Sequence, residues 1–456
     1  MKLKQIAHIV KGKILSGSDE KEIQEHVSID TRTMSAGDIF IAIIGKTQDG
    51  HIYAKEAEKK KAGVIIVSQE IEDISVPVIL VSDTTEALFA LAKHHKNTHF
   101  HGLLIAITGS VGKTTTKEMV AHILSQKYRV AKSPGNYNNH IGIPLTLLSL
   151  KETDEICVLE LGMNHEGEIS RLSRMCEPHV AMITKIGSAH IGFLGSMERI
   201  MQAKMEITDG LNDGILLVNG DDKRLSKLRD TKTYQVGFCG THRNAMTKVS
   251  DIDATLDTLS FQLLEDHKKY HFFYPYGGKH LLTNLLLAIE MGILCDVPIE
   301  LIQKAVREMP CFEKRLEKIS LKGNNILIDD TYNASLDSVL ADIDYMNLYH
   351  GKKLFIFGDI LEVGTFGKKI HREIAKKLRK CHNLEVLCVG EETKQFPKLL
   401  KKCARFDTVE ELVKTLDYAK LEDTFILVKG SRKMHLDFVA EKIKNEWKLS
   451  NSNENN

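Results

Sequence analysis

Short apolar runs alternate with helical stretches along most of this 456-residue chain. Strands that alternate with helices in this way form mostly parallel sheets wrapped by helices, so the predicted fold class is α/β. The central runs expected to form buried strands are Leu103–Ile107, Ile156–Leu161, Val180–Thr184 and Gly214–Val218. The later ones are Ile326–Ile328, Leu354–Phe357, Val386–Val389 and Phe425–Val428.

A chain of this length contains about two to four domains, and its pattern favours three. We expect a small mixed α/β domain at residues 1–100, a central parallel-sheet domain at 101–311 and a Rossmann-like α/β domain at 312–448. The polar tail at 449–456 offers nothing to pack and is predicted to be disordered. Short strand-like runs in the first domain are Asp38–Ile44, Gly63–Val67 and Val76–Val81.

Composition excludes several classes of protein. Lys and Arg total 62 against 61 Asp and Glu, so no global field would recruit nucleic acid or an anionic membrane. The eight cysteines are scattered without a CxxC pair, which is typical of free thiols in a reducing compartment. No signal peptide and no run of about 18 apolar residues is present. We therefore expect a cytoplasmic protein without a membrane span, and a monomer.

The strongest motif is a glycine-containing loop between the run Leu103–Ile107 and a predicted helix at Lys117–Lys127. Such a loop turns backbone N–H groups inward and adds the positive end of the helix dipole, which together bind phosphate. The common P-loop pattern has four residues between its first glycine and its Gly-Lys pair, whereas only two separate the glycines here. The loop is therefore a shortened variant, and a chance Gly-Lys-Thr in a loop remains the alternative. The residues expected to bind nucleotide here are Gly109, Ser110, Val111, Gly112, Lys113, Thr114 and Thr115.

The loop predicts a nucleotide but not a reaction. Lys113 would reach the β- and γ-phosphates, and the Thr114 hydroxyl would hold Mg²⁺. A GTPase would need an Asn/Thr-Lys-x-Asp motif to read the base, and the nearest match, Thr184–Gly187, lacks the aspartate. The sequence therefore argues against guanine.

Three ionisable residues fall where a buried sheet or helix would not ordinarily place them. Glu160 ends an apolar strand, where a structural salt bridge and a magnesium ligand both fit. His190 lies in a glycine-punctuated loop after the next strand. Lys204 falls on the apolar stripe of a helix that begins near Ser196; it could reach solvent with its ammonium, or be buried as a neutral amine able to form a carbamate with CO₂.

Further polar residues gather in segments predicted to flank the same sheet edges. Amides crowd Asn136–His140, and His280 and Asn284 lie four residues apart on one face of an apolar helix predicted at Leu281–Met291. Three polar clusters, Asp329–Asn333, Gly358–Glu362 and Lys429–Arg432, each follow a predicted strand. Carboxyl ends of parallel strands share one edge, so these three clusters are expected to form a site.

In order along the chain, these segments resemble the Mur ligases, ATP-dependent enzymes that build the peptide of bacterial peptidoglycan. The resemblance spans essentially the whole chain. It is carried by TGSVGKTTTK, GNYNNHIGIP, LELGMN, GSAHIGFLGS, QAKMEI, IDDTYNAS, FGDILEVG and VKGSRKM. The N-terminal block SIDTRTMSAGDIFIAIIGKTQDGH, together with GDILEVG and KGSRKM, is similar to members that add D-alanyl-D-alanine to UDP-N-acetylmuramoyl-tripeptide.

The resemblance implies ATP and two magnesium ions as cofactors, and an acyl-phosphate intermediate. It implies catalytic roles for Lys113, Glu160, His190, Lys204 and Arg315, with metal ligands Thr114, Glu160, His190 and Lys204 if carbamylated. Further nucleotide contacts would come from Asn139, Asn284, Arg315 and Asp330. Substrate contacts would come from Thr31, Arg32, Asp49 and His51 in the first domain and Asn333, Asp359, Lys429 and Ser431 in the last.

Two other readings stay open at this stage. A related Mur-type or polyglutamate-type ligase would join a different acid and amine. A nucleotide-binding regulatory protein without turnover is the alternative from another class. Its support is two departures from the family pattern, Leu281 after His280 and Ser335-Leu336 where the family usually has Asn-Pro.

Overall fold

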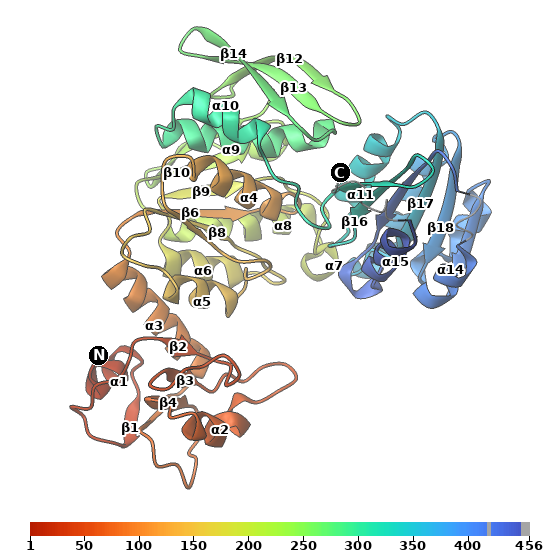
Figure 1. Cartoon of the computed structure of the whole chain (residues 1–456). Helices are drawn as coiled ribbons and strands as arrows, with labels where there is room; N and C mark the ends of the chain where they lie inside the picture. The colour runs from red at the N-terminus through yellow and green to blue at the C-terminus, as the bar shows by residue number, and fades with distance from the viewer. Residues whose placement is uncertain (417–420, 448–456) are drawn as a thin grey trace, which may run out of the picture.

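The computed structural model describes residues 1–416 and 421–447. Three α/β bodies follow one another along the chain, and the long helix α3 leads from the first into the second (Figure 1). The tail predicted at 449–456 lies outside the described residues. No helix of the described ranges is both long and apolar enough to cross a membrane.

The N-terminal sheet has the order β1-β5-β4-β3-β2, and β1 is its antiparallel member. Side chains alternate between two cores: Ile39 and Ile41 face α1 and α3, whereas Phe40 faces α2. Covering both faces explains why every residue of β4 is buried. The elements are α1 (Leu3–Ile9), β1 (Lys13–Ser16), β2 (Val27–Ser28), β3 (Ile39–Ile41), η1 (Gly50–Tyr53), α2 (Ala54–Lys59), β4 (Val64–Val67), β5 (Val78–Leu80) and α3 (Thr84–His99).

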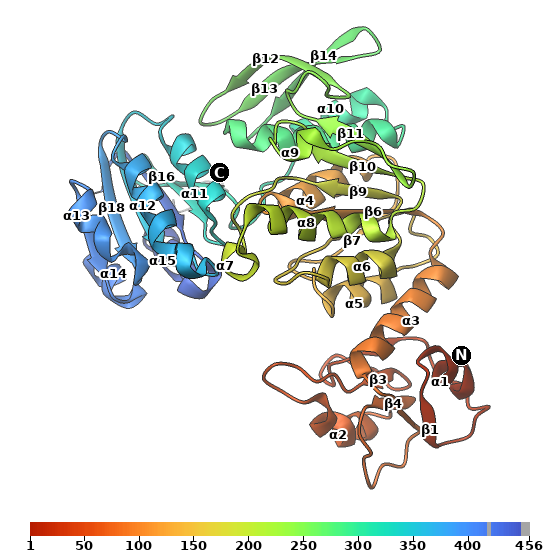
Figure 2. The ribbon, with the colours of Figure 1, turned by 180° about the vertical axis from the view of Figure 1, so that it is seen from behind.

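The central sheet is wholly parallel, in the order β11-β10-β9-β6-β8-β7. Helices α4 and α9 cover one face, and α5, α6 and α8 cover the other (Figure 2). Its strands are β6 (Leu103–Thr108), β7 (Val130–Lys132), β8 (Ile156–Glu160), β9 (Val180–Ile183), β10 (Gly214–Asn219) and β11 (Tyr234–Cys239). Its helices are α4 (Lys113–Leu124), α5 (Gly142–Leu148), α6 (Glu168–Cys176), α7 (Ile191–Leu194), α8 (Met197–Met205), η2 (Glu206–Gly210), η3 (Leu225–Lys227), η4 (Lys279–Leu281), α9 (Leu282–Leu294) and α10 (Ile299–Arg307).

Strand–helix alternation does not continue to residue 310 as the sequence suggested. An antiparallel sheet of β12 (Lys248–Ala254), β13 (Leu259–Glu265) and β14 (Lys268–Tyr274) intervenes and packs with α9 and α10 (Figure 1). Only one face of this sheet is buried, so β12 is largely polar and carries no apolar run. The rings of Phe261 and Phe272 stack at 5.4 Å on the buried face.

The C-terminal sheet has the order β15-β16-β20-β17-β18-β19, with β15 antiparallel to β16 and the rest parallel. The four strands predicted for this region are present. The strands are β15 (Glu317–Leu321), β16 (Asn325–Asp330), β17 (Lys352–Gly358), β18 (Leu384–Val389), β19 (Cys403–Phe406) and β20 (Thr424–Lys429). The helices are α11 (Leu336–Met346), η5 (Gly364–Phe366), α12 (Gly367–Leu378), η6 (Glu392–Gln395), α13 (Phe396–Leu399), α14 (Val409–Thr415), η8 (Arg432–Met434) and α15 (Asp437–Trp447).

Two predicted helices begin elsewhere than expected. Helix α4 starts at Lys113, four residues before the predicted start, so its first turn is part of the glycine loop. His280 lies in the 3₁₀ turn η4 that precedes α9, and not on the helix itself. Ser335 is the N-cap of α11 and its hydroxyl accepts from the Ser338 N–H, which gives the Ser335-Leu336 pair a local structural reason.

Candidate active site

A cavity of about 1480 Å³ opens between the central and C-terminal domains. Strand ends of both sheets meet there: β6, β8 and β9 from one, β16 and β20 from the other. Ligands bind outside the carboxyl ends of parallel strands, which is where this cavity lies. The predicted site residues that line it are Ser110, Val111, Gly112, Lys113, Thr114, Thr115, Asn139, Glu160, His190, Asn284, Arg315, Asp330, Asn333 and Lys429.

The glycine loop requires its glycines for space and for backbone conformation. Gly109 and Gly112 have φ of +152° and +86°, which side chains rarely allow. A Cβ at Gly109 would lie 2.0 Å from the Thr184 Oγ1, and one at Gly112 would lie 2.6 Å from the Asn284 Oδ1. Lys113 Nζ donates to the Gly109 carbonyl at 2.9 Å, and burial lowers the pKa of Lys113. The loop is therefore packed against the elements that bring Thr184 and Asn284.

Oxygen donors gather at the start of α4. The Thr114 hydroxyl donates to Glu160 Oε2 at 2.5 Å, and the Asn138 amide donates to Glu160 Oε1 at 2.9 Å. Glu160 is 2% exposed, and its carboxylate is hydrogen-bonded to Thr114 and Asn138 without an ion pair among the described residues, so the salt-bridge interpretation is wrong. Arg315 donates to the Thr114 Oγ1 at 2.8 Å. A buried carboxylate beside a hydroxyl is a suitable donor set for a hard cation such as Mg²⁺.

Arg315 enters this group from the junction between the domains. Its guanidinium lies 4.0 Å from the centre of the Tyr332 ring, in cation–π contact. This stacking helps to hold the Arg315 side chain beside the glycine loop, within hydrogen-bond distance of Thr114. The structure thus places a cation from the C-terminal side at the start of α4.

His190 contacts the C-terminal domain. Its Nδ1 lies 3.1 Å from Glu362 Oε2, and this pairing lowers the pKa of the Glu362 carboxyl. Burial, with help from Lys204 and Lys113, lowers the pKa of His190. Both residues have left-handed backbones, with φ of 64° and 65°, and such strain is most often kept at functional sites.

Lys204 is fully buried on α8, so the reading in which its ammonium reaches solvent is wrong. Its Nζ has no hydrogen-bond partner among the described residues. Burial, together with the Lys113 charge, holds the pKa of Lys204 well below its usual range. The neutral amine is the nucleophilic form, so this position favours reaction with CO₂.

Three family models match successive parts of the chain. They are the Mur ligase family catalytic domain at residues 24–96, the Mur ligase middle domain at 107–292 and the Mur ligase glutamate ligase domain at 314–432. The UDP-N-acetylmuramoyl-tripeptide–D-alanyl-D-alanine ligase of Bacillus subtilis is 34% identical, over 96% of this chain and 97% of its own. The chain belongs to the Mur ligase family.

Solved structures show the same three-domain α/β fold. MurF from Acinetobacter baumannii superposes with a TM-score of 0.91 at 28% identity, covering 97% of this Mur ligase and 98% of that chain. MurF ligase from Thermotoga maritima, in complex with ADP, has a TM-score of 0.83 at 27% identity, covering 92% and 97%. The predicted α/β fold and family are confirmed.

The substrate residues predicted in the N-terminal domain lie outside the cavity. Asp49 and His51 hold the turn η1 together: Asp49 accepts from the His51 N–H, and its Oδ1 lies 2.6 Å from His51 Nδ1. The His51 Nε2 accepts from the Ser68 N–H, so both ring nitrogens are engaged. Thr31 is buried, and Arg32 is exposed and paired with Asp30. Their part in substrate binding stays a prediction.

The C-terminal clusters do meet, but only partly in the cavity. Lys429 reaches Asp330, and its Nζ lies 2.8 Å from the Asp342 Oδ2. Asp359 and Ser431 lie behind this edge: the Asp359 carboxylate accepts from two N–H groups of the turn after β18, and the Ser431 hydroxyl accepts from the Leu361 N–H. In this Mur ligase both therefore support the loops around the cavity, and their proposed contact with the amine stays a prediction.

Sequence reasoning missed the residues that join the domains. Asp337 on α11 and Lys185 after β9 face each other, and Lys46 reaches the cavity from the N-terminal domain. In the sequence, Asp337 is an acidic residue in the first turn of a helix and Lys46 is a lysine in a loop, and neither belongs to a recognisable motif. The sequence does not distinguish Asn138 from the neighbouring asparagines, whereas the structure shows that its amide donates to Glu160. By contrast Asn139 Oδ1 accepts from the Ile141 and Gly142 N–H groups, at the start of α5.

Proposed function

We propose that this chain joins D-alanyl-D-alanine to UDP-N-acetylmuramoyl-tripeptide with ATP, as a ligase of peptidoglycan precursor synthesis. Full-length similarity to ligases with these substrates supports the choice of acid and amine. The observation that carries the reaction type is the meeting of the phosphate loop, Glu160 and Arg315 at one end of a cavity shared by two domains. That arrangement suits phosphoryl transfer followed by attack from a second substrate.

Phosphoryl transfer activates the acid. A carboxylate resists attack by an amine because it is negatively charged and would have to expel oxide. We propose that its oxygen attacks the γ-phosphorus, ADP leaves, and an acyl phosphate forms. Lys113, Arg315 and the loop N–H groups would offset the charge that develops on the phosphoryl oxygens.

The donors at the start of α4 fit magnesium. Thr114 and Glu160 would hold one ion beside the ATP phosphates, because both are oxygen donors and Glu160 lacks a cationic partner in the described ranges. A carbamate on Lys204 would give its buried Nζ a polar function and, with His190, would offer ligands for a second ion. Bound magnesium supplies neutralisation of phosphate charge.

Amide formation completes the reaction. The amine nitrogen of D-alanyl-D-alanine attacks the acyl carbon, phosphate leaves from the tetrahedral intermediate, and the nitrogen loses its proton. We place the amine on the C-terminal side, near Asn333 and Lys429, with Asp359 and Ser431 shaping the loops. Asn139 and Asn284 near the phosphate loop and Asp330 near the hinge are the proposed nucleotide contacts. Domain closure would exclude water, which otherwise hydrolyses the acyl phosphate.

The acid would extend from the cavity to the N-terminal domain. Its UDP end is assigned to that domain, with Thr31, Arg32, Asp49 and His51 as the predicted contacts or supports. We further propose a cytosolic monomer whose product serves wall growth, and through it cell shape and division. All eight cysteines are free, which agrees with a reducing compartment.

An omission assay tests the proposal. Phosphate release from ATP is measured with UDP-N-acetylmuramoyl-tripeptide and D-alanyl-D-alanine together, and then with each left out. Release is expected only when both are present. Phosphate release that does not require D-alanyl-D-alanine but depends on another amine would favour a related ligase. ATP binding without phosphate release for any pair of substrates would favour a regulatory protein. Glu160→Gln should lower the rate at least about 100-fold, while Glu300→Gln, at an exposed position of α10, should not.

A further inference from the structure

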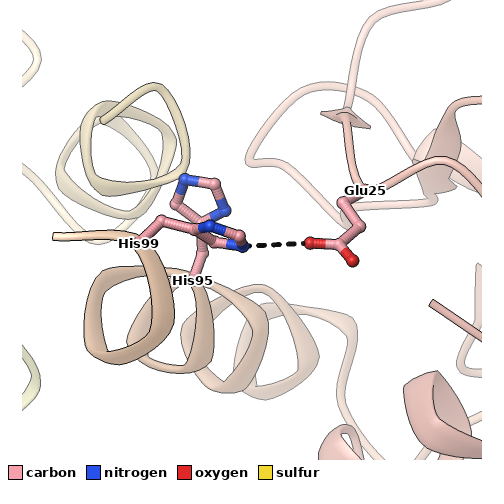
Figure 3. A group of neighbouring side chains, drawn as sticks. All are labelled: Glu25, His95 and His99. Carbon is pink, nitrogen blue, oxygen red and sulfur yellow. Dashed lines mark hydrogen bonds and ion pairs between the residues drawn. The ribbon is translucent and has the colours of Figure 1, made fainter. Parts of the chain in front are cut away.

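Two histidines and a glutamate meet outside the cavity lining, where the N-terminal domain joins the central one (Figure 3). His95 and His99 lie one helical turn apart near the end of α3, and Glu25 comes from the segment before β2. Each offers one ligand atom within 4.8 Å of the other two. His99 Nε2 lies 3.1 Å from Glu25 Oε2, and the two imidazole rings are 4.6 Å apart.

The remaining nitrogen of each ring is already engaged. His95 Nε2 lies 2.9 Å from the Leu150 carbonyl oxygen, which can only accept, so Nε2 carries the proton and Nδ1 keeps a free lone pair. His99 Nδ1 lies 3.3 Å from Glu152 Oε1, so a proton there leaves the lone pair on Nε2, toward Glu25. Carbonyl and carboxylate partners of this kind orient the imidazole ligands of metal sites.

The spacing also suits a metal ion. Ligand bonds of about 2.0–2.2 Å in a tetrahedron place neighbouring ligand atoms about 3.3 Å apart. The separation between His99 Nε2 and Glu25 Oε2 is close to that, and a ring nitrogen of His95 lies within 4.8 Å of both other ligand atoms. Two imidazoles and one carboxylate favour a borderline cation over Mg²⁺ or Ca²⁺, which prefer oxygen alone.

We propose that Glu25, His95 and His99 bind one divalent transition-metal cation of the Zn²⁺ class, with water completing the coordination. Side-chain exposures of 28% for His99 and 40% for Glu25 leave that position open to water. None of the three residues lines the cavity, so the role of the bound ion would be structural. Its ligands come from the N-terminal domain and α3, and both oriented rings are held by the central-domain loop at Leu150 and Glu152.

The bound ion would therefore stabilise one orientation of the N-terminal domain. Without it, His99 can serve as a protonated bridge between Glu25 and Glu152, a weaker contact because all three groups are partly exposed. An ion pair of this kind and a metal site use the same residues. A measured affinity for metal therefore distinguishes a metal site from an ion pair made of these residues.

The test is a cobalt titration of the chelator-treated full chain, in excess Mg²⁺ so that the ATP-side donors are occupied. The d–d absorption of tetrahedral Co²⁺ reports binding, and Zn²⁺ displaces it. We expect one equivalent per chain in the wild type. Affinity should fall by about 10- to 100-fold or more in His95→Ala and His99→Ala, and about tenfold in Glu152→Gln, which loses only an orienting partner.

His94→Ala is the matched control, since His94 is the neighbouring histidine on the same helix and is not part of the cluster. It should keep the wild-type affinity. Equal Co²⁺ affinity in wild type and His99→Ala would overturn the proposal, as would a wild type that gives no tetrahedral spectrum. Thermal unfolding without metal checks that the variants fold. Glu25→Gln, which keeps the side-chain volume, is used in place of any variant that does not fold. Zn²⁺ should raise the melting temperature of the wild type and of His94→Ala, but not of His95→Ala.

Discussion

The carboxylate of Asp337 accepts a hydrogen bond of 2.9 Å from the backbone N–H of Ser188 and so ties the C-terminal domain to the loop after β9. Lys185 Nζ lies 3.1 Å from the other carboxylate oxygen. A Cβ at Gly187 would lie 2.4 Å from Asp337 Oδ2, so this glycine allows the close approach. The contact lies at the cavity and joins the central and C-terminal domains, so it would favour their closure.

Asp337→Ala should weaken this closure. A hydrogen bond to a charged group contributes about 1.5–3 kcal/mol, but the partial exposure of this one reduces it to about 1 kcal/mol. We therefore expect kcat/KM to fall about fivefold to tenfold and small-angle scattering to show a more open chain. Asp344→Ala on the same helix removes an ion pair internal to the C-terminal domain and should change neither quantity. Equal behaviour of the two variants would contradict a role in closure.

Lys204→Ala should abolish most activity, because it removes the amine that would carry the carbamate. Short carboxylates such as formate or acetate should restore part of the rate by occupying the vacated space with an anion. The measurement is ADP formation with and without added carboxylate. Wild-type activity in the variant would remove the carbamate proposal, and a carbon-13 signal from labelled CO₂ on the wild type would support it directly.

Glu290 on α9 is expected to make the stability of the protein depend on pH. Burial raises the pKa of this carboxyl to about 7. The unfolded chain ionises it near 4.5 while the folded chain keeps the proton, so folding binds protons and stability falls as pH rises from about 4.5 to 7. Glu290→Gln should therefore increase the free energy of unfolding by on the order of 3 kcal/mol at pH 8, and by little near pH 4.5. Urea unfolding at both pH values checks this, with the exposed Glu300→Gln as control.

Lys46 tests whether the N-terminal domain helps to hold the acid. It lies in the exposed loop before η1 and reaches the cavity lining. Lys46→Ala should raise the KM for the UDP-linked acid about fivefold, with kcat little changed, because a surface cation attracts phosphate or carboxylate only modestly. Lys59→Ala, exposed on α2 of the same domain, should leave KM unchanged. A change in KM for ATP alone would assign Lys46 to the nucleotide instead.

Periodicity predicted β6, β8, β9 and β10 of the central sheet and β16, β17, β18 and β20 of the C-terminal sheet, because strands buried on both faces are continuous apolar runs. It did not predict the edge strands β7, β11, β15 and β19 of these sheets, which are only partly buried. It missed β12, whose polar outer face leaves no such run. Local motifs located Lys113, Thr114 and Glu160, since a strand end next to a phosphate loop constrains geometry over a few residues. Contacts such as that of Ser188 with Asp337 join positions 149 residues apart, and no local pattern encodes them. The burial of Lys204 likewise depends on how α8 packs, because a lysine on an apolar stripe can either be buried or extend its ammonium to solvent.

Helix α3 has a mechanical consequence. Its 16 residues form a rod about 24 Å long between the N-terminal sheet and the central domain. A tilt of about 10° at its base would carry the far end about 4 Å, a lever large enough to change how near Lys46 comes to the phosphate loop. We therefore expect the angle between α3 and the central domain to influence which length of acid the enzyme accepts.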